Sequence, residues 1–344
     1  MKDLKFIKIN KKRNLGIQFL RFILCLWIVI IHCSRIKRNH LLYLSRGFHV
    51  PTFILLSFYF FYNTLSKRNI DKIINRFKRL LIPYIIWPIL IYILNNLFIY
   101  TRTFGQFISI IPIKSLFSQF IYGSSVHGIF WFQFNLIFLS LLFTIFSFIF
   151  KQNFIIIIYF LALLCIYLQI SEVNYYFFVS FKHKFIINIA SLIELLPLAT
   201  VGCFLSKSKI ADSIYKLPFH YYYYSLLFYI ICLFRYKIFS DLKGFRYPNI
   251  VINIFASVTF LFFFVNISFD KFKYIDRFIN NITQFTGGIY YLHIIIRDHF
   301  ERTNFFLAKS RNYYHSFLIY LICYTLCFIG FRIFKNNIFK YMFV

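Results

Sequence analysis

The sequence is poor in charged residues, and poorest in acidic ones. Asp, Glu, Lys and Arg make up 14% of its 344 residues, and only 10 residues are Asp or Glu. Soluble domains carry about 25% charged residues, so this composition excludes a soluble enzyme or binding domain. Instead, 60% of the residues are hydrophobic and gather in long blocks. The blocks approach the ~20 apolar residues that a helix needs to cross a membrane, which predicts an integral membrane protein.

Cysteine pairs are also missing. The 7 cysteines lie within or beside apolar blocks, and no CxxC pair occurs. This pattern gives no support to a zinc site or a disulfide framework, and we expect no metal. We interpret the cysteines as small buried hydrophobic residues.

The shortage of acidic residues leaves a formal net charge of +29. A charge of this size can indicate a nucleic-acid partner. Here, however, the basic residues stand between the apolar blocks, where Lys and Arg contact lipid headgroups. We therefore expect membrane lipid as a partner and no nucleic acid.

The apolar blocks predict an all-α fold, a polytopic bundle of about ten transmembrane helices in a single domain spanning residues 1–344. No soluble domain is expected. The predicted helices are 16–33, 47–64, 80–99, 128–150, 154–170, 187–205, 221–238, 250–268, 284–299 and 315–334. With the N-terminus inside, the cytoplasmic segments carry 22 Lys and Arg residues, against 16 elsewhere outside the first span. Positive charge favours the cytoplasmic side, so both termini are predicted to be cytoplasmic.

The first predicted helix carries Arg21 and His32. An ionisable side chain inside a membrane costs about 2.5–3.5 kcal/mol on insertion scales and is a candidate for function. Eleven residues amount to about three helical turns, so the two side chains share one face, roughly 16 Å apart along the axis. Such a face is expected to line a polar cavity. Alternatively, Arg21 extends to the cytoplasmic headgroups and His32 marks the opposite interface.

Two further segments carry polar residues at helix ends. His49 precedes Pro51 in the first turn of the second predicted helix, where it is either interfacial or part of a site. Arg76, Lys78 and Arg79 form a cluster of cations just before the third predicted helix. Such a cluster suits the phosphates of a soluble donor, although it also serves as a plain cytoplasmic anchor.

These three segments, in this order, resemble the acyltransferase family 3 membrane proteins, which O-acylate sugars and glycans. Arg21 and His32 match the family's Arg, ten residues, His motif. Phe48–Phe53 and Ser57–Tyr59 match its F-H-x-P-x-F and S-G-Y segments, and Arg76–Tyr84 matches R-x-x-R-L-x-x-P-Y. Weaker matches are Trp131–Phe132, Gly202–Lys207 and Gly288–Ile296 with His293, so the resemblance covers essentially the whole chain.

The sequence departs from the family pattern in two places. Phe58 stands where the family usually has Gly. Phe132–Gln133 lacks the acidic residues that one branch of the family carries after its Trp, which speaks against a mechanism that needs a carboxylate there. Glu194 is an acidic residue placed within a predicted span, where it is either a partner for a buried cation or histidine or a helix-end residue, since Pro197 follows closely.

The resemblance implies a multi-pass O-acyltransferase, as in bacterial cell membranes. It would move an acyl group, acetyl foremost, from cytoplasmic acyl-CoA to a hydroxyl of a cell-surface or lipid-linked glycan. His32 would act as the base and Arg21 would orient the donor. Arg76, Arg79 and Lys78 would hold the donor phosphates, while His49, Trp131 and His293 would line the acceptor site.

Two other functions stay open at this point. Intramembrane Arg and His also suit a transporter or flippase of a lipid-linked saccharide, although transporters often show internal repeats and Gly- or Pro-broken helices. With 10 Gly, 7 Pro and no visible repeat, that function is disfavoured. A non-catalytic relative that keeps the fold is the other alternative, and the intact His32, Arg76 and Arg79 argue against it.

Overall fold

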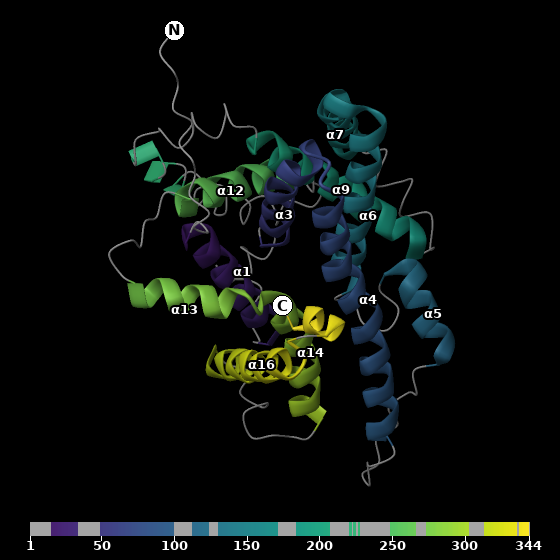
Figure 1. The fold of residues 1–344 in the computed structure, drawn as a ribbon, viewed down its shortest axis with the longest axis vertical. Helices are drawn as coiled ribbons and strands as arrows, with labels where there is room; N and C mark the ends of the chain where they lie inside the picture. Colours follow the sequence, from purple (N-terminus) through teal and green to yellow (C-terminus); the bar gives the residue numbers. More distant parts are fainter. Residues whose placement is uncertain are drawn as a thin grey trace.

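The chain is helical wherever its structure is described. The computed structural model describes residues 15–33, 49–99, 112–123, 130–170, 184–206, 220–221, 223–224, 226–227, 248–265, 273–302, 313–335 and 337–343. Every regular element within these ranges is a helix (Figure 1), which confirms the all-α class.

Most predicted helices are present with small changes at their ends. They are α1 (Leu15–Cys33), α3 (His49–Ser66), α6 (Phe130–Ile149), α7 (Phe154–Ile170), α9 (Lys184–Leu205), α12 (Pro248–Val265), α14 (Thr286–Arg302) and α16 (Tyr313–Ile333). The predicted helix 221–238 lies mostly outside the described residues. The count of ten helices and the cytoplasmic termini therefore stay predictions.

The third predicted helix begins ten residues earlier than expected. Helix α4 spans Ile70–Ile99 and includes the basic cluster, which was predicted to be a cytoplasmic segment before the helix. The side chain of Asn69 caps this end by accepting a hydrogen bond from the Lys72 backbone N–H at 3.0 Å. Asp71 in the first turn adds a favourable interaction with the helix dipole. These local signals start the helix before its apolar part begins.

Two described helices lie in segments predicted as connections, and two short 3-10 helices accompany them. Helix α5 (Ile113–Tyr122) lies within the connection 100–127, and α13 (Lys273–Thr283) lies in the segment 269–283. Helix α5 ends at Gly123, whose φ of 79° is left-handed and whose N–H bonds to the Gln119 carbonyl. The 3-10 helices are η2 (Lys151–Asn153) and η3 (Ile338–Met342).

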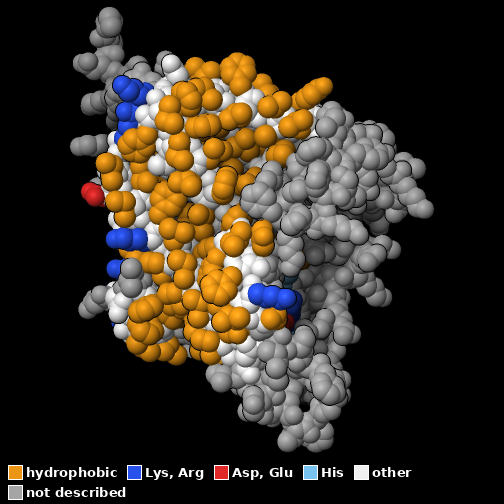
Figure 2. Space-filling model, turned by 90° about the vertical axis from the view of Figure 1, so that its right-hand side faces the viewer, with side chains coloured by type: hydrophobic (Ala, Val, Ile, Leu, Met, Phe, Trp, Pro, Cys, Tyr) orange, Lys and Arg blue, Asp and Glu red, His pale blue; other side chains and the backbone are white. Residues whose placement is uncertain are grey.

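The surface of the described bundle matches a membrane environment. Four described helical segments are long and apolar enough to cross a bilayer, namely Leu15–Cys33, Ile70–Leu94, Phe130–Ile149 and Tyr314–Ile333. Figure 2 shows one side of the molecule covered largely by hydrophobic side chains, with most of the Lys and Arg side chains in view along one edge. Exposed apolar residues of this kind include Ile85, Ile93, Phe117, Phe138 and Leu141. Large exposed apolar areas are rare on soluble monomers, so the protein is an integral membrane protein.

The described helices pack around α1 and around α3, and α12 contacts both of these helices. Helix α1 packs against α12, α13, α14 and α16, whereas α3 packs against α6, α9 and α12, and α9 against α7. The buried residues form three hydrophobic clusters, and Phe53 of α3 packs against all three. This arrangement places the first-helix motif and the second-helix motif in neighbouring parts of one bundle.

The closest approach between α3 and α9 is made by a glycine. A Cβ added to Gly202 of α9 would lie 2.3 Å from the backbone oxygen of Leu55 in α3. Only the missing side chain allows these two backbones to touch. Gly202 begins one of the weaker matches to the family pattern, Gly202–Lys207, and the structure shows why glycine is needed there.

Replacing Gly202 with alanine is expected to destabilise the protein. The new methyl group would meet backbone, which cannot rotate away, and overpacking of this kind costs about 1–3 kcal/mol. Thermal unfolding of the purified protein in detergent measures the effect. Phe204→Ala serves as the control, since Phe204 is an exposed residue of the same helix. Equal melting temperatures for Gly202→Ala and wild type would contradict the close contact.

Candidate functional site

Helices α1 and α14 lie side by side, run in the same direction and stay in register. At one end, Arg21 donates a hydrogen bond to Thr286 Oγ1 at 3.0 Å. At the other end, Arg297 donates to the His32 carbonyl at 3.1 Å. Both contacts join residues 265 positions apart, so about three turns of each helix are matched. The polar face predicted for the first helix is therefore the face that meets α14.

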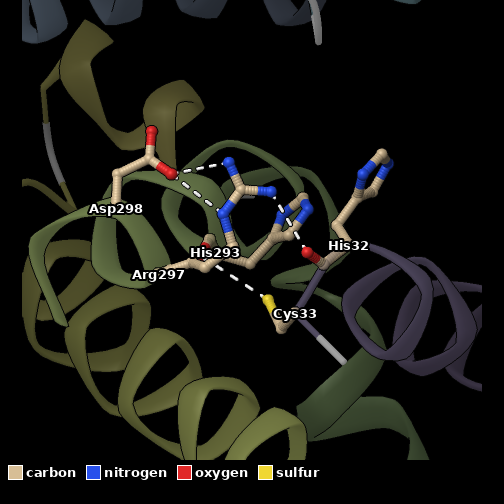
Figure 3. A network of polar contacts seen from close by, with 5 residues as sticks. All are labelled: His32, Cys33, His293, Arg297 and Asp298. Atoms are coloured by element: carbon tan, nitrogen blue, oxygen red, sulfur yellow. Dashed lines mark hydrogen bonds and ion pairs between the residues drawn. The ribbon is translucent and has the colours of Figure 1, made fainter. Parts of the chain in front are cut away.

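The register places two imidazole rings next to each other. The ring centroids of His32 and His293 are 5.4 Å apart, and Figure 3 shows the two side chains as neighbours, His32 at the end of α1 and His293 on α14. His293 is fully buried, whereas His32 is partly buried. Sequence analysis assigned these residues separate roles, and the structure brings them together.

The tautomer of His293 follows from its backbone contact. Its Nδ1 lies 3.1 Å from the Ile289 carbonyl, one turn earlier in α14. A carbonyl only accepts, so Nδ1 must carry the proton, and in the neutral ring Nε2 then has a free lone pair. Nε2 of His293 is buried and has no hydrogen-bond partner among the described residues. The site thus holds a basic nitrogen that the fold leaves unused.

The end of α1 is held in place by three contacts from two other helices. Arg297, which forms an ion pair with Asp298 at 2.6 Å, donates to the His32 carbonyl. The Cys33 thiol donates to the His293 carbonyl at 3.9 Å, and His315 Nδ1 of α16 lies 3.4 Å from the Cys33 carbonyl. The last carbonyls of a helix lack partners within it and attract cations and donors. These contacts fix His32 relative to α14.

Arg21 occupies the opposite end of the same helix pair. Besides Thr286, it donates to Gln18 Oε1 at 3.3 Å. One turn after Arg21 in α1, the Cys25 thiol donates to the Thr286 carbonyl at 3.8 Å. Arg21 is therefore oriented by neighbours rather than extended freely to headgroups. Its position about three turns from His32 matches the predicted spacing.

A second polar cluster surrounds Arg76, where the second and third sequence motifs meet. Its guanidinium donates to Ser57 Oγ at 2.8 Å and to Ser140 Oγ at 3.0 Å and 3.1 Å. It lies over the Phe61 ring at 4.1 Å from the centroid, and 5.3 Å from that of Phe58. All these partners are neutral, so the charge of Arg76 is solvated by hydroxyls and aromatic faces without being neutralised.

The three predicted cations do not share one environment. Arg76 is partly buried among α3, α4 and α6, whereas Lys78 and Arg79 are exposed on α4. Residues three apart differ by about 60° around a helix, which here is enough to put Arg76 inside and Arg79 outside. The cluster thus consists of Arg76, which is partly buried in the bundle, and of Lys78 and Arg79, which are exposed beside it.

The comparison with protein families identifies the chain. The family model described as an acyltransferase domain matches residues 14–333, essentially the whole chain. The chain belongs to this acyltransferase family. Comparisons with curated proteins and with solved structures give no significant match. The family resemblance predicted from the sequence motifs is confirmed, and the protein is a membrane acyltransferase.

The remaining predicted site residues of the acyltransferase occupy different positions in the bundle. His49 is buried in the first turn of α3. Trp131 of α6 is partly buried, and its ring is 6.2 Å from that of Phe132. Phe132 lies 5.7 Å from Tyr290, which in turn lies 6.1 Å from His293. A row of aromatic rings therefore connects Trp131 with the histidine pair.

The structure also explains both departures of this acyltransferase from the family pattern. Phe58 is fully buried and packs 4.6 Å from Phe143, beside Arg76. Gln133 donates from its side-chain nitrogen to the Leu80 carbonyl of α4 at 2.9 Å. A carboxylate could not donate this hydrogen bond. Position 133 thus holds α6 against α4, which agrees with the absence of a catalytic acid there.

Gln133→Glu is expected to destabilise the acyltransferase by about 1–3 kcal/mol, because two acceptors would then face each other at a buried position. Asn63→Asp makes the same chemical change at an exposed residue of α3 and should leave stability unchanged. Thermal unfolding in detergent compares the two variants. A Gln133→Glu protein as stable as Asn63→Asp would show that the Leu80 contact contributes nothing.

Sequence reasoning missed several residues of the site. Arg297 and Asp298 lie inside a predicted span, and as intramembrane charges they could have been noticed. Glu194 was chosen instead, and its side chain is exposed on α9. Ser57, Ser140 and Thr286 carry no such signal, because a hydroxyl in a helix is common and only the packing reveals its partner. Among the described residues no group of three or more His, Cys, Asp or Glu could hold a metal ion.

Proposed function

We propose that this membrane acyltransferase moves an acyl group, acetyl foremost, from cytoplasmic acyl-CoA to a hydroxyl of a cell-surface or lipid-linked glycan. The observation that carries the proposal is the matched pair of α1 and α14, with Arg21 at one end and His32 beside His293 at the other. On the predicted orientation, Arg21 faces the cytoplasmic side, where acyl-CoA is available.

His32 is the proposed base of the reaction. Histidine suits this role because its ordinary pKa lies near neutrality. His32 takes the proton of the acceptor hydroxyl, and the oxygen attacks the thioester carbonyl. The tetrahedral intermediate then collapses, the C–S bond breaks, and the proton goes to the departing CoA thiolate. The partial exposure of His32, in contrast to buried His293, fits a group that an acceptor must reach.

The cations are proposed to hold the donor. The hydrogen-bond partners of Arg76 are neutral hydroxyls, so a phosphate would bring its guanidinium the negative charge that these partners lack. Lys78 and Arg79 lie exposed on the same helix and would attract the donor from solution. Arg21 orients the donor at the other end of the helix pair, so that its acyl end reaches the base about 16 Å away. His49 and Trp131 are proposed to line the acceptor site.

The test uses the purified protein in nanodiscs with labelled acetyl-CoA and succinyl-CoA, with and without a mixture of lipid-linked glycans. Alkali-labile label recovered in the glycan fraction, from one of the two donors, is the expected result. A transporter of lipid-linked saccharides would bind neither donor and would instead move the saccharide across the bilayer of proteoliposomes. Saccharide movement without donor binding would replace the proposal.

A further inference from the structure

We propose that His293 is a positioning residue for the base, a neutral imidazole that accepts a hydrogen bond from His32 and stabilises it once it is protonated. The inference rests on the proposed function, because it assigns a partner to the same base. His293 acts through His32 and not on the substrate, since it is fully buried while His32 is partly exposed.

The first support is the fixed tautomer of His293. Because Nδ1–H donates to the Ile289 carbonyl, the ring cannot rotate without losing that bond. Its Nε2 lone pair is left over, buried and without a partner among the described residues. Leaving a buried polar atom without a partner destabilises the fold. The fold tolerates this cost beside a second imidazole, which is the arrangement a positioning residue requires.

The second support is the geometry of the two rings. Their centroids are 5.4 Å apart with an interplanar angle of 42°. This separation allows a hydrogen bond to form directly after a small movement or through one water, and catalytic hydrogen bonds often tighten only when substrate is bound. In Figure 3 the His293 ring lies between Arg297 and the His32 ring.

The third support is that the two rings cannot drift apart. Arg297 donates to the His32 carbonyl and lies one turn after His293 on α14. The Cys33 thiol bonds to the carbonyl of His293 itself. Each contact runs from a side chain of one helix to the backbone carbonyl of a histidine on the other. The backbone positions of His32 and His293 are therefore fixed relative to each other, and only their side chains can rotate.

The proton balance of the reaction gives His293 a defined task. When His32 has taken the acceptor's proton it is a partly buried cation, which a hydrogen-bond acceptor beside it stabilises. The Nε2 lone pair of His293 accepts a hydrogen bond from the His32 N–H and so stabilises that cation. The proton then goes to the CoA thiolate as the C–S bond breaks. His293 keeps its own proton throughout.

The test compares His293→Leu with His293→Gln, in which a side-chain carbonyl can still accept a hydrogen bond from His32. We expect His293→Leu to lower kcat about 100-fold with KM for donor and acceptor unchanged. His293→Gln should recover part of that loss. His299→Leu, a change at an exposed residue of the same helix, should match wild type. Raised KM values with normal kcat, or equal losses in the Leu and Gln variants, would overturn the proposal.

A second measurement does not depend on turnover. Nitrogen NMR of labelled histidine reports the hydrogen bonding of the His32 ring, with His32→Ala used to assign its signals. His293→Leu is expected to shift the His32 signals, and His299→Leu is not. Unchanged His32 signals in His293→Leu would overturn the pairing. Inactive wild type with the expected shifts would contradict only the proposed function.

Discussion

Replacing His32 with alanine is expected to lower kcat for acyl transfer by about 10²–10⁴-fold, the usual contribution of a general base. Binding of acyl-CoA should be retained, because the proposed donor contacts come from Arg21, Arg76 and the surface cations. Steady-state transfer of labelled acetyl groups gives kcat, and calorimetric titration with acetyl-CoA gives the dissociation constant.

The matched control for this change is His299→Ala. His299 lies on α14 with an exposed side chain, so its loss should leave both constants unchanged. Melting temperatures within a few degrees of wild type would show that His32→Ala still folds. A His32→Ala protein with more than one tenth of wild-type kcat would exclude His32 as the base.

Replacing Arg76 with glutamine is expected to raise KM for acyl-CoA by about 10–100-fold. The estimate takes a charge-assisted hydrogen bond as worth about 1.5–3 kcal/mol. The KM of Arg76→Lys should lie between those of wild type and Arg76→Gln. Lysine keeps the positive charge but lacks the guanidinium fork that contacts Ser57 and Ser140. The measurement is donor-dependent kinetics at saturating acceptor, alongside thermal unfolding.

The exposed residue Lys72 on the same helix provides the control. Lys72→Gln removes one positive charge from α4 without touching the buried cluster, so its KM should change by less than about threefold, as expected for a screened surface charge. If Arg76→Gln lowered the melting temperature and left KM unchanged, Arg76 would be a structural link between α3, α4 and α6, and the donor site would lie elsewhere.

Helices and motifs were the parts of this protein that the sequence could predict. Long apolar blocks have few alternatives to membrane helices, and spacing along one helix fixed the shared face of Arg21 and His32. The start of α4 was misplaced because hydropathy ignores the cap by Asn69. Helices α5 and α13 were overlooked because they are too short to appear as spans.

Contacts between helices were beyond the sequence. The pairing of His32 with His293 depends on the register of α1 and α14, which is set by the packing of many apolar side chains. Likewise, Arg76 and Arg79 fit the same sequence motif, yet only the bundle decides which of them points inward. From the sequence, Phe58 was only a departure from the family's usual Gly, and the structure shows its ring packed beside Arg76 and Phe143.

In the proposed reaction, the donor and the acceptor bind at opposite ends of the pair formed by α1 and α14. Arg21 and Thr286 join the beginnings of α1 and α14, and His32 and Arg297 join their ends. A long donor such as acyl-CoA could enter at the first end and present its thioester about three turns away. A glycan hydroxyl would meet it at the partly exposed His32.

The most direct test of the account is a single-turnover reaction of labelled acetyl-CoA with the purified protein in nanodiscs, run beside His32→Ala. The account predicts that wild type releases the label as acetate or transfers it to added glycan, while His32→Ala binds the same donor and leaves it intact. Equal rates of label release by both proteins would contradict it, as would the absence of any donor binding by wild type.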